Sequence, residues 1–271
     1  MHPLKGIALK ICSVITFITM ASLIKATAQH VPAGQAVFFR SVFALSVILA
    51  WLAVRGDLRT GLKAASPMGH FWRGFVGTAA MGLGFAGLGL LPLPEVTAIG
   101  YAAPLMTVIL AAMFLGEQVR LFRLGAVALG MVGVLIVLGP RLSAFSGDTV
   151  EKTAALGAML VLTGALCAAL AQIYIRKLVQ SEQTSAIVFY FSVTSASLSL
   201  LTLPFGWVLP TGQEAAFLVL AGLLGGMGQK FLTSAYRFAP ASVVAPFDYA
   251  SMLFAILIGM FFFNEIPDLR T

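Results

Sequence analysis

Long apolar stretches separated by short polar breaks repeat along the whole chain. Each stretch holds roughly 20 residues, which is the length that an α-helix needs to cross the hydrocarbon layer of a bilayer. The stretches lie at 5–26, 34–54, 70–91, 94–115, 122–139, 154–175, 185–208, 214–236 and 241–263. This pattern predicts an all-α fold, a polytopic bundle of transmembrane helices with nine spans.

Composition and charge exclude several other classes of protein. Hydrophobic residues make up 59% of the chain and charged residues only 10%, whereas a soluble domain has about 25% charged residues. The net charge of +7 does not indicate a nucleic-acid partner, because the basic residues are scattered between apolar stretches. Cys12 and Cys167 lie inside apolar stretches without metal-ligand spacing, so we expect no metal and no cofactor.

The distribution of lysine and arginine predicts the orientation. With the N-terminus in the cytoplasm, ten of these residues, including Arg73 and Arg176, fall in cytoplasmic connections and four, including Lys25, fall outside. Three more lie within the predicted spans. Basic residues concentrate in cytoplasmic loops, so the sequence favours a cytoplasmic N-terminus.

The second half of the chain repeats features of the first half. An offset of 151 residues aligns Lys25 with Arg176. An offset of 148 residues aligns a proline, a tyrosine and a glutamate with residues of the same type: Pro92 with Pro240, Tyr101 with Tyr249, and Glu117 with Glu265. The repeat divides the chain into a first unit (1–140), a connecting loop (141–153) and a second unit (154–271).

A repeated unit of five spans has consequences for topology and function. Because five is odd, the second unit must lie upside down in the membrane, and such inverted repeats are characteristic of secondary transporters. Arg123, which opens the fifth span of the first unit, aligns with Thr271, the last residue. We therefore expect that this chain lacks a tenth helix.

The sequence resembles the EamA-type members of the drug/metabolite transporter superfamily. The resemblance spans the whole chain and is strongest at residues 91–104, at Phe114-Leu-Gly-Glu117 and at residues 239–249. It implies ten helices around a central cavity, in a bacterial inner membrane. The Pro-Phe-Asp-Tyr sequence ending at Tyr249 is similar to a branch that includes riboflavin and S-adenosylmethionine carriers.

Ionisable residues deep in a span are candidates for function, because a charge at the bilayer centre costs about 2.5–3.5 kcal/mol on insertion scales. Asp248 lies about 10 Å into the ninth span at 1.5 Å per residue, where it can couple protons or bind a substrate amine. Gln229 and Lys230 lie in the middle of the eighth span. Lys230 either binds substrate or pairs with Asp248, and we favour the pair.

Six other positions are of interest, and three of them, Arg40, Tyr101 and Tyr249, have two interpretations each. Arg40 binds substrate or, as we favour, extends its guanidinium to the membrane surface, and Lys10 is expected to reach its surface in the same way. Tyr101 and Tyr249 face each other across the repeat axis to stack on a planar substrate, or they serve only in helix packing. The matched Glu117 and Glu265 are expected to form contacts at helix ends or gates.

The sequence therefore predicts a secondary transporter that moves a small organic metabolite, such as a vitamin like riboflavin, a nucleoside-like compound or an amino acid, by alternating access. Its expected partners are the lipid bilayer and the substrate, together with protons if the carrier is proton-coupled; a facilitative carrier is the alternative. A drug efflux pump of the same fold is the alternative. A membrane scaffold or a membrane-embedded enzyme is less favoured, since Asp248 is the one carboxylate that we place deep in the membrane.

Overall fold

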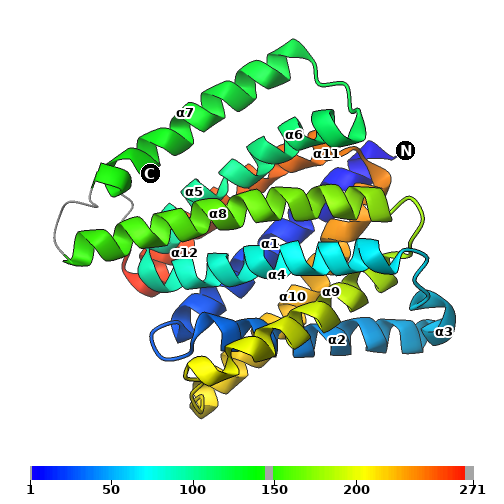
Figure 1. Cartoon of the computed structure of the whole chain (residues 1–271), viewed down its shortest axis with the longest axis horizontal. Coiled ribbons are helices and arrows are strands. Elements are labelled where there is room, and N and C mark those ends of the chain that lie inside the picture. The colour runs from blue at the N-terminus through cyan, green and yellow to red at the C-terminus, as the bar shows by residue number, and fades with distance from the viewer. Residues whose placement is uncertain (1, 144–148, 266–271) are drawn as a thin grey trace.

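The computed structural model describes residues 2–143 and 149–265, and every regular element in these ranges is helical (Figure 1). The elements, in chain order, are α1 (Pro3–Thr27), α2 (Ala33–Arg55), α3 (Leu58–Gly61), α4 (Pro67–Leu90), α5 (Leu93–Gly100), α6 (Ala102–Leu115), α7 (Leu121–Ser143), α8 (Thr149–Leu178), α9 (Thr184–Ser199), η2 (Leu200–Phe205), α10 (Gly212–Phe238), α11 (Ala241–Val244), η3 (Ala245–Ala250) and α12 (Ser251–Phe263).

All nine predicted stretches coincide with helical segments. In the described part of the chain, seven segments are long and apolar enough to cross a membrane: Pro3–Thr27, Ala33–Arg55, Leu93–Leu115, Glu151–Leu178, Thr184–Phe205, Gly212–Phe238 and Ala241–Phe263. The glycine-rich α4 and the apolar stretch Leu124–Gly139 of α7 do not meet these criteria. Thr271, where a tenth helix is expected to begin, lies outside the described residues.

Two predicted spans are interrupted near their middle, at equivalent places in the repeat. The span 94–115 changes from α5 to α6 at Tyr101, and the span 241–263 passes through the 3-10 segment η3, which contains Tyr249. Pro104 follows Tyr101 within one turn, and Pro246 lies in η3 itself. Proline removes a backbone donor and prevents a regular α-helix from continuing. Broken helices of this kind surround the binding sites of many secondary transporters.

The two halves of the chain interlock rather than lie apart. The helix α1 of the first half packs along α10 of the second, and α4 packs along α8 and α9. The helix α7 lies along one edge of the bundle in Figure 1 and packs on α5, α6 and α8. Its exposed side chains include Leu129, Leu135 and Ile136, as expected for a helix that faces lipid.

Close packing between α2 and α10 depends on glycines. A Cβ atom added at Gly226 would lie 3.0 Å from the backbone oxygen of Ala44 and from Cβ of Val47, and one at Gly222 would lie 3.2 Å from the carbonyl oxygens of Phe39 and Arg40. Small residues four apart allow membrane helices to approach closely. Because the obstructing atoms include backbone, the helices cannot make room by changing side-chain rotamers.

Gly226→Ala is therefore expected to destabilise the protein. The extra methyl group overpacks the α2–α10 interface, at a cost of about 1–3 kcal/mol, and lowers Tm by roughly 3–8 °C. Thermal unfolding of the detergent-solubilised protein measures the change. Gly82→Ala is the matched control, since a Cβ there meets no atom within 4 Å. Equal Tm values for the two variants would contradict this account of the interface.

Candidate functional site

Each end of the bundle carries a carboxylate that closes a junction between the two halves. We call the end where α1 begins the near face and the end where α1 finishes the far face. At the far face, the Glu265 carboxylate accepts a hydrogen bond from Leu93 N at 2.8 Å and lies 2.9 Å from Lys25 Nζ. The Lys25 ammonium also donates to Leu91 O at 2.9 Å. We call Lys25, Glu265 and these backbone groups the far-face cluster.

The near face carries the same arrangement. The Glu117 carboxylate accepts hydrogen bonds from Ala241 N at 3.2 Å and from Ser242 N at 3.1 Å, and it lies 3.5 Å from Arg176 Nε. The Arg176 guanidinium donates to Tyr236 O at 2.7 Å. These groups form the near-face cluster. In both clusters a carboxylate satisfies the free N–H groups of a helix that begins directly after a proline.

The clusters are related by the offsets of the repeat. Glu117 aligns with Glu265 and Leu93 with Ala241, while Lys25 aligns with Arg176. Equivalent residues therefore make equivalent contacts at opposite faces, as two units of opposite orientation require. The expectation that the two glutamates contact helix ends agrees with these hydrogen bonds.

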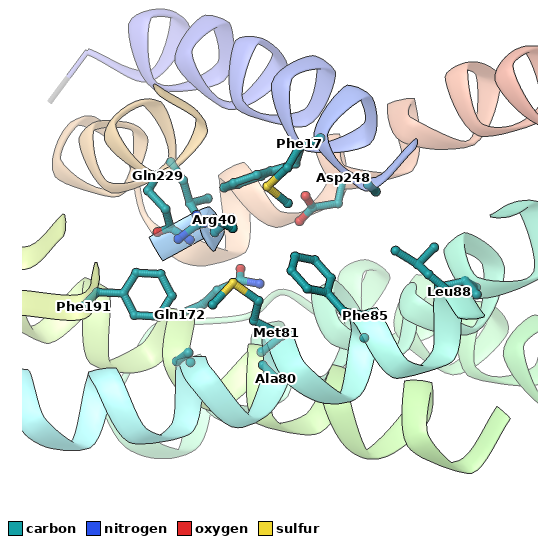
Figure 2. A pocket seen from close by; sticks show the side chains of 18 of the residues that line it. Phe17, Arg40, Ala80, Met81, Phe85, Leu88, Gln172, Phe191, Gln229 and Asp248 are labelled. Carbon is teal, nitrogen blue, oxygen red and sulfur yellow. The ribbon is translucent and has the colours of Figure 1, made fainter. Parts of the chain in front are cut away.

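A cavity of about 360 Å³ lies between the halves, and its wall reaches the far-face cluster at Leu93. Apolar side chains such as Phe17, Met81 and Phe85 cover much of its wall (Figure 2). Four charged side chains also line it: Lys10, Arg40, Arg73 and Asp248. In the view of Figure 2, Arg40 lies beside Gln229 and Phe191, whereas Asp248 lies farther along the cavity beside Phe17.

The partner of Asp248 is Lys10. The Lys10 ammonium lies 2.8 Å from Asp248 Oδ2, and its side chain is only 2% exposed. The preference for a Lys230–Asp248 pair is therefore wrong, and so is the expectation that Lys10 extends to the membrane surface. Lys10 is the eighth residue of α1 and lines the cavity. Its ammonium is buried there, and the nearby carboxylate offsets part of the desolvation cost.

The two arginines of the cavity are both buried. Arg40 is 1% exposed and Arg73 is 2% exposed, so Arg40 does not extend to the surface, and the assignment of Arg73 to a cytoplasmic connection is wrong. The Arg40 guanidinium donates to Gly225 O at 3.0 Å, and the Arg73 guanidinium donates to Gln229 Oε1 at 3.1 Å. Both guanidinium carbons lie over the Phe191 ring, 5.4 and 4.0 Å from its centroid.

The sequence is similar to known proteins over nearly the whole length of the chain. The sequence matches the EamA-like transporter family at residues 4–139 and 155–271. The chain belongs to this family. It is thus a multi-pass membrane protein that transports small metabolites.

Two curated proteins illustrate the range of EamA-like relatives. An S-adenosylmethionine uptake transporter of Rickettsia prowazekii is 26% identical over 268 residues, which are 99% of this chain and 87% of that protein. The pseudopaline exporter CntI of Pseudomonas aeruginosa is 29% identical over 270 residues, or 98% of this chain and 90% of that protein. The chain also superposes on a solved crystal structure with a TM-score of 0.73 at 20% identity. The match includes 98% of this chain and 90% of the chain in that structure, which shows a shared fold.

The EamA-like fold separates the neighbours Gln229 and Lys230. Gln229 lines the cavity and accepts the hydrogen bond from Arg73. Lys230 is not among the cavity residues, and its ammonium lies over the Trp51 ring, 4.1 Å from the centroid. Adjacent residues on a helix point about 100° apart, so the two residues face different neighbours.

Tyr101 and Tyr249 meet at the interruptions of their spans. Their ring centroids lie 4.7 Å apart, and the Tyr101 hydroxyl donates to Tyr249 O at 3.1 Å. Tyr101 lines a smaller cavity of about 240 Å³ that shares Asp248 and Gln172 with the central one. The tyrosines therefore lie next to the central cavity, beyond its wall.

Sequence reasoning missed three polar or aromatic residues of the site. Arg73 lies seven residues into α4, deep enough to have been placed with the intramembrane charges. Phe191 aligns with Arg40 at the 151-residue offset, and the contact between these two equivalent residues places both at the repeat axis. Gln172, which accepts a hydrogen bond from the Tyr236 hydroxyl, lies four residues before Arg176 and has no comparable signal.

The buried pair in this EamA-like chain is expected to show coupling in a double-mutant cycle. Asp248→Ala leaves the Lys10 ammonium without its carboxylate and should lower Tm in detergent. We expect the free energy of unfolding to fall by about 1–2 kcal/mol, or Tm by roughly 5 °C. This loss is smaller than for a fully buried pair, because Asp248 remains 25% exposed. Adding Lys10→Met should restore much of the loss. Additive effects of the two substitutions would refute the pair.

Proposed function

We propose that this chain is a secondary transporter of a small organic metabolite that works by alternating access. The supporting observation is the placement of a charged cavity between two interlocked halves, with equivalent carboxylate clusters at the two faces. We further propose that the near face is cytoplasmic, in agreement with the distribution of basic residues. The bilayer is then that of a bacterial inner membrane.

In this mechanism the two clusters act as gates. Each cluster joins a helix start in one half to a glutamate from the other half, so a rocking motion of the halves separates the groups of one cluster and keeps those of the other together. Both clusters pair a glutamate with a basic side chain and with backbone N–H at a helix start, so breaking either one costs a free energy of the same order. Neither orientation of the transporter is then strongly favoured, which is what repeated cycling requires.

Asp248 is the proposed coupling residue. Its carboxylate forms the ion pair with Lys10 inside the cavity, within the space that a substrate would occupy. Protonation of Asp248, or a substrate amine that competes for it, would break the ion pair and change the packing between α1 and η3. The elements that move would then respond to the occupant of the cavity, as coupling demands.

The proposal extends to the class of substrate and the direction of transport. Vitamins such as riboflavin, nucleoside-like compounds and amino acids remain the classes to test, and S-adenosylmethionine comes first because of the Rickettsia relative. Export by the same cavity is the second candidate, favoured by the similarity to the pseudopaline exporter. Alternating access permits either direction, and the gradients that drive transport select between them.

Gate variants should expose the cavity selectively. In a Cys12→Ser, Cys167→Ser background, a cysteine at Ala80 places a thiol on the cavity wall. Adding Glu265→Gln weakens the far-face cluster and should increase labelling by an impermeant maleimide added at the far face. Glu117→Gln should increase labelling from the near face instead. Right-side-out and inside-out vesicles measure the two rates, and each variant controls for the other. Identical labelling patterns would contradict the gating role.

Loss of the Asp248 charge should strongly reduce coupled transport. Asp248→Asn keeps the size of the side chain, and we expect transport to fall roughly tenfold or more, the factor that about 1.4 kcal/mol produces. Mass spectrometry of expressing and empty cells, over a panel of vitamins, nucleosides, amino acids and S-adenosylmethionine, first identifies a transported compound. Asp57→Asn removes an exposed carboxylate and is the matched control. Wild-type transport by Asp248→Asn would remove this residue from the mechanism.

A further inference from the structure

The two cavity arginines have donors without acceptors. Nε and Nη1 of Arg40 and Nε and Nη1 of Arg73 are buried and have no hydrogen-bond partner. Among the residues that the structure describes, no carboxylate lies within ion-pair distance of either guanidinium. The carboxylate of the cavity, Asp248, is paired with Lys10. The cavity therefore holds three cationic side chains and one anionic side chain.

Such an arrangement is costly without an anion. A guanidinium at the centre of a membrane helix costs about 2.5–3.5 kcal/mol on insertion scales, and a second one nearby adds repulsion. The single hydrogen bond of each arginine and the contact with Phe191 offset part of this cost, since a cation–π contact contributes about 0.5–2 kcal/mol. Neither contact supplies negative charge. An oxyanion would supply both the charge and the missing acceptors.

Two glycines leave the space that the guanidinium groups occupy. A Cβ atom at Gly225 would meet Nε and Cζ of Arg40, and one at Gly77 would meet Nη1 of Arg73. These glycines align at the 148-residue offset. Each half thus contributes a glycine that makes room for one arginine.

We propose that Arg40 and Arg73 bind an oxyanion group, a carboxylate or a phosphate, of the transported metabolite. The Phe191 ring supports the two guanidinium groups, and Gln229 orients Arg73 through its side-chain oxygen. The apolar wall around Phe17, Met81 and Phe85 receives the organic part of the same molecule. The substrate is therefore an organic anion or a zwitterion. This assignment rests on the proposed transport function, but it makes a separate prediction about binding.

Thermal unfolding of the purified protein in detergent tests the assignment without transport. The probes are pairs that differ in one carboxylate: benzoate with benzamide, methionine with methioninamide, and S-adenosylmethionine with its decarboxylated analogue. Inorganic phosphate is compared with chloride at equal ionic strength. At least one oxyanion should raise Tm above the value with its partner that lacks the carboxylate, or with chloride in the case of phosphate. If carboxylates raise Tm and inorganic phosphate does not, the site binds carboxylates. If phosphate raises Tm and the carboxylates do not, the site binds phosphate groups.

Variants then separate this site from a structural role. Arg40→Met and Arg73→Met should abolish the oxyanion-dependent shift while leaving the ligand-free Tm equal or higher, because each removes an uncompensated buried charge. A structural role predicts a lower ligand-free Tm. Gly225→Ala keeps every charge but displaces Arg40, and should weaken oxyanion binding roughly tenfold. Arg55→Met removes an exposed guanidinium from the same helix and should retain the full shift.

The results distinguish the inference from the proposed function. If no oxyanion raises the Tm of the wild-type protein, or if the shift persists in both arginine variants, the inference is wrong. An oxyanion-dependent shift together with an absence of transport in liposomes would overturn the proposed function and leave the binding site in place. Transport of a neutral compound without competition from any oxyanion would overturn the assignment of substrate class.

Discussion

The cost of placing charge inside a bilayer governs the arrangement of this molecule. Lys10, Asp248, Arg40 and Arg73 are all on membrane-spanning segments or on the glycine-rich α4, and each lines the same cavity. A side chain of this kind can be tolerated only beside an opposite charge, a hydrogen-bond acceptor or water. The helices therefore pack so that their charged residues converge, and the convergence leaves the space that the substrate is proposed to use.

The symmetry of the repeat holds at the two faces and fails at the centre. At the faces, Glu117 and Glu265 make equivalent contacts with equivalent backbone groups. At the centre, Arg40 aligns with Phe191, Gln229 with Met81, and Asp248 with Gly100. Gates that open in turn benefit from equal strength, whereas a site for one asymmetric molecule needs different groups on its two sides. The duplication thus keeps the same residue types at the two faces, where the proposed gates open in turn. In the cavity, where both halves contact one ligand, the equivalent residues differ.

Much of the fold could be predicted because it depends on local patterns. The apolar stretches located the helices, and the depth of Asp248 marked it as an intramembrane charge. The offsets of the repeat correctly brought Tyr101 next to Tyr249. What the sequence did not determine was the partner of each charge. Choosing Lys10 over Lys230 for Asp248 requires the packing of α1 against η3, which involves segments more than 230 residues apart.

Arg73 was missed for the same reason, because the sequence does not determine which way a basic side chain points. The matched residues of the two halves supply part of the missing information. A basic residue seven positions into a helix can extend to the surface or turn inward, and periodicity alone does not separate the two. The glycine at position 77, one turn farther along α4, aligns with Gly225, which makes room for Arg40. A small residue that recurs in both halves beside a buried cation indicates space kept for that cation. In this chain the matched pair Gly77 and Gly225 marks two inward-facing charges, and the positions of both glycines follow from the amino-acid sequence alone.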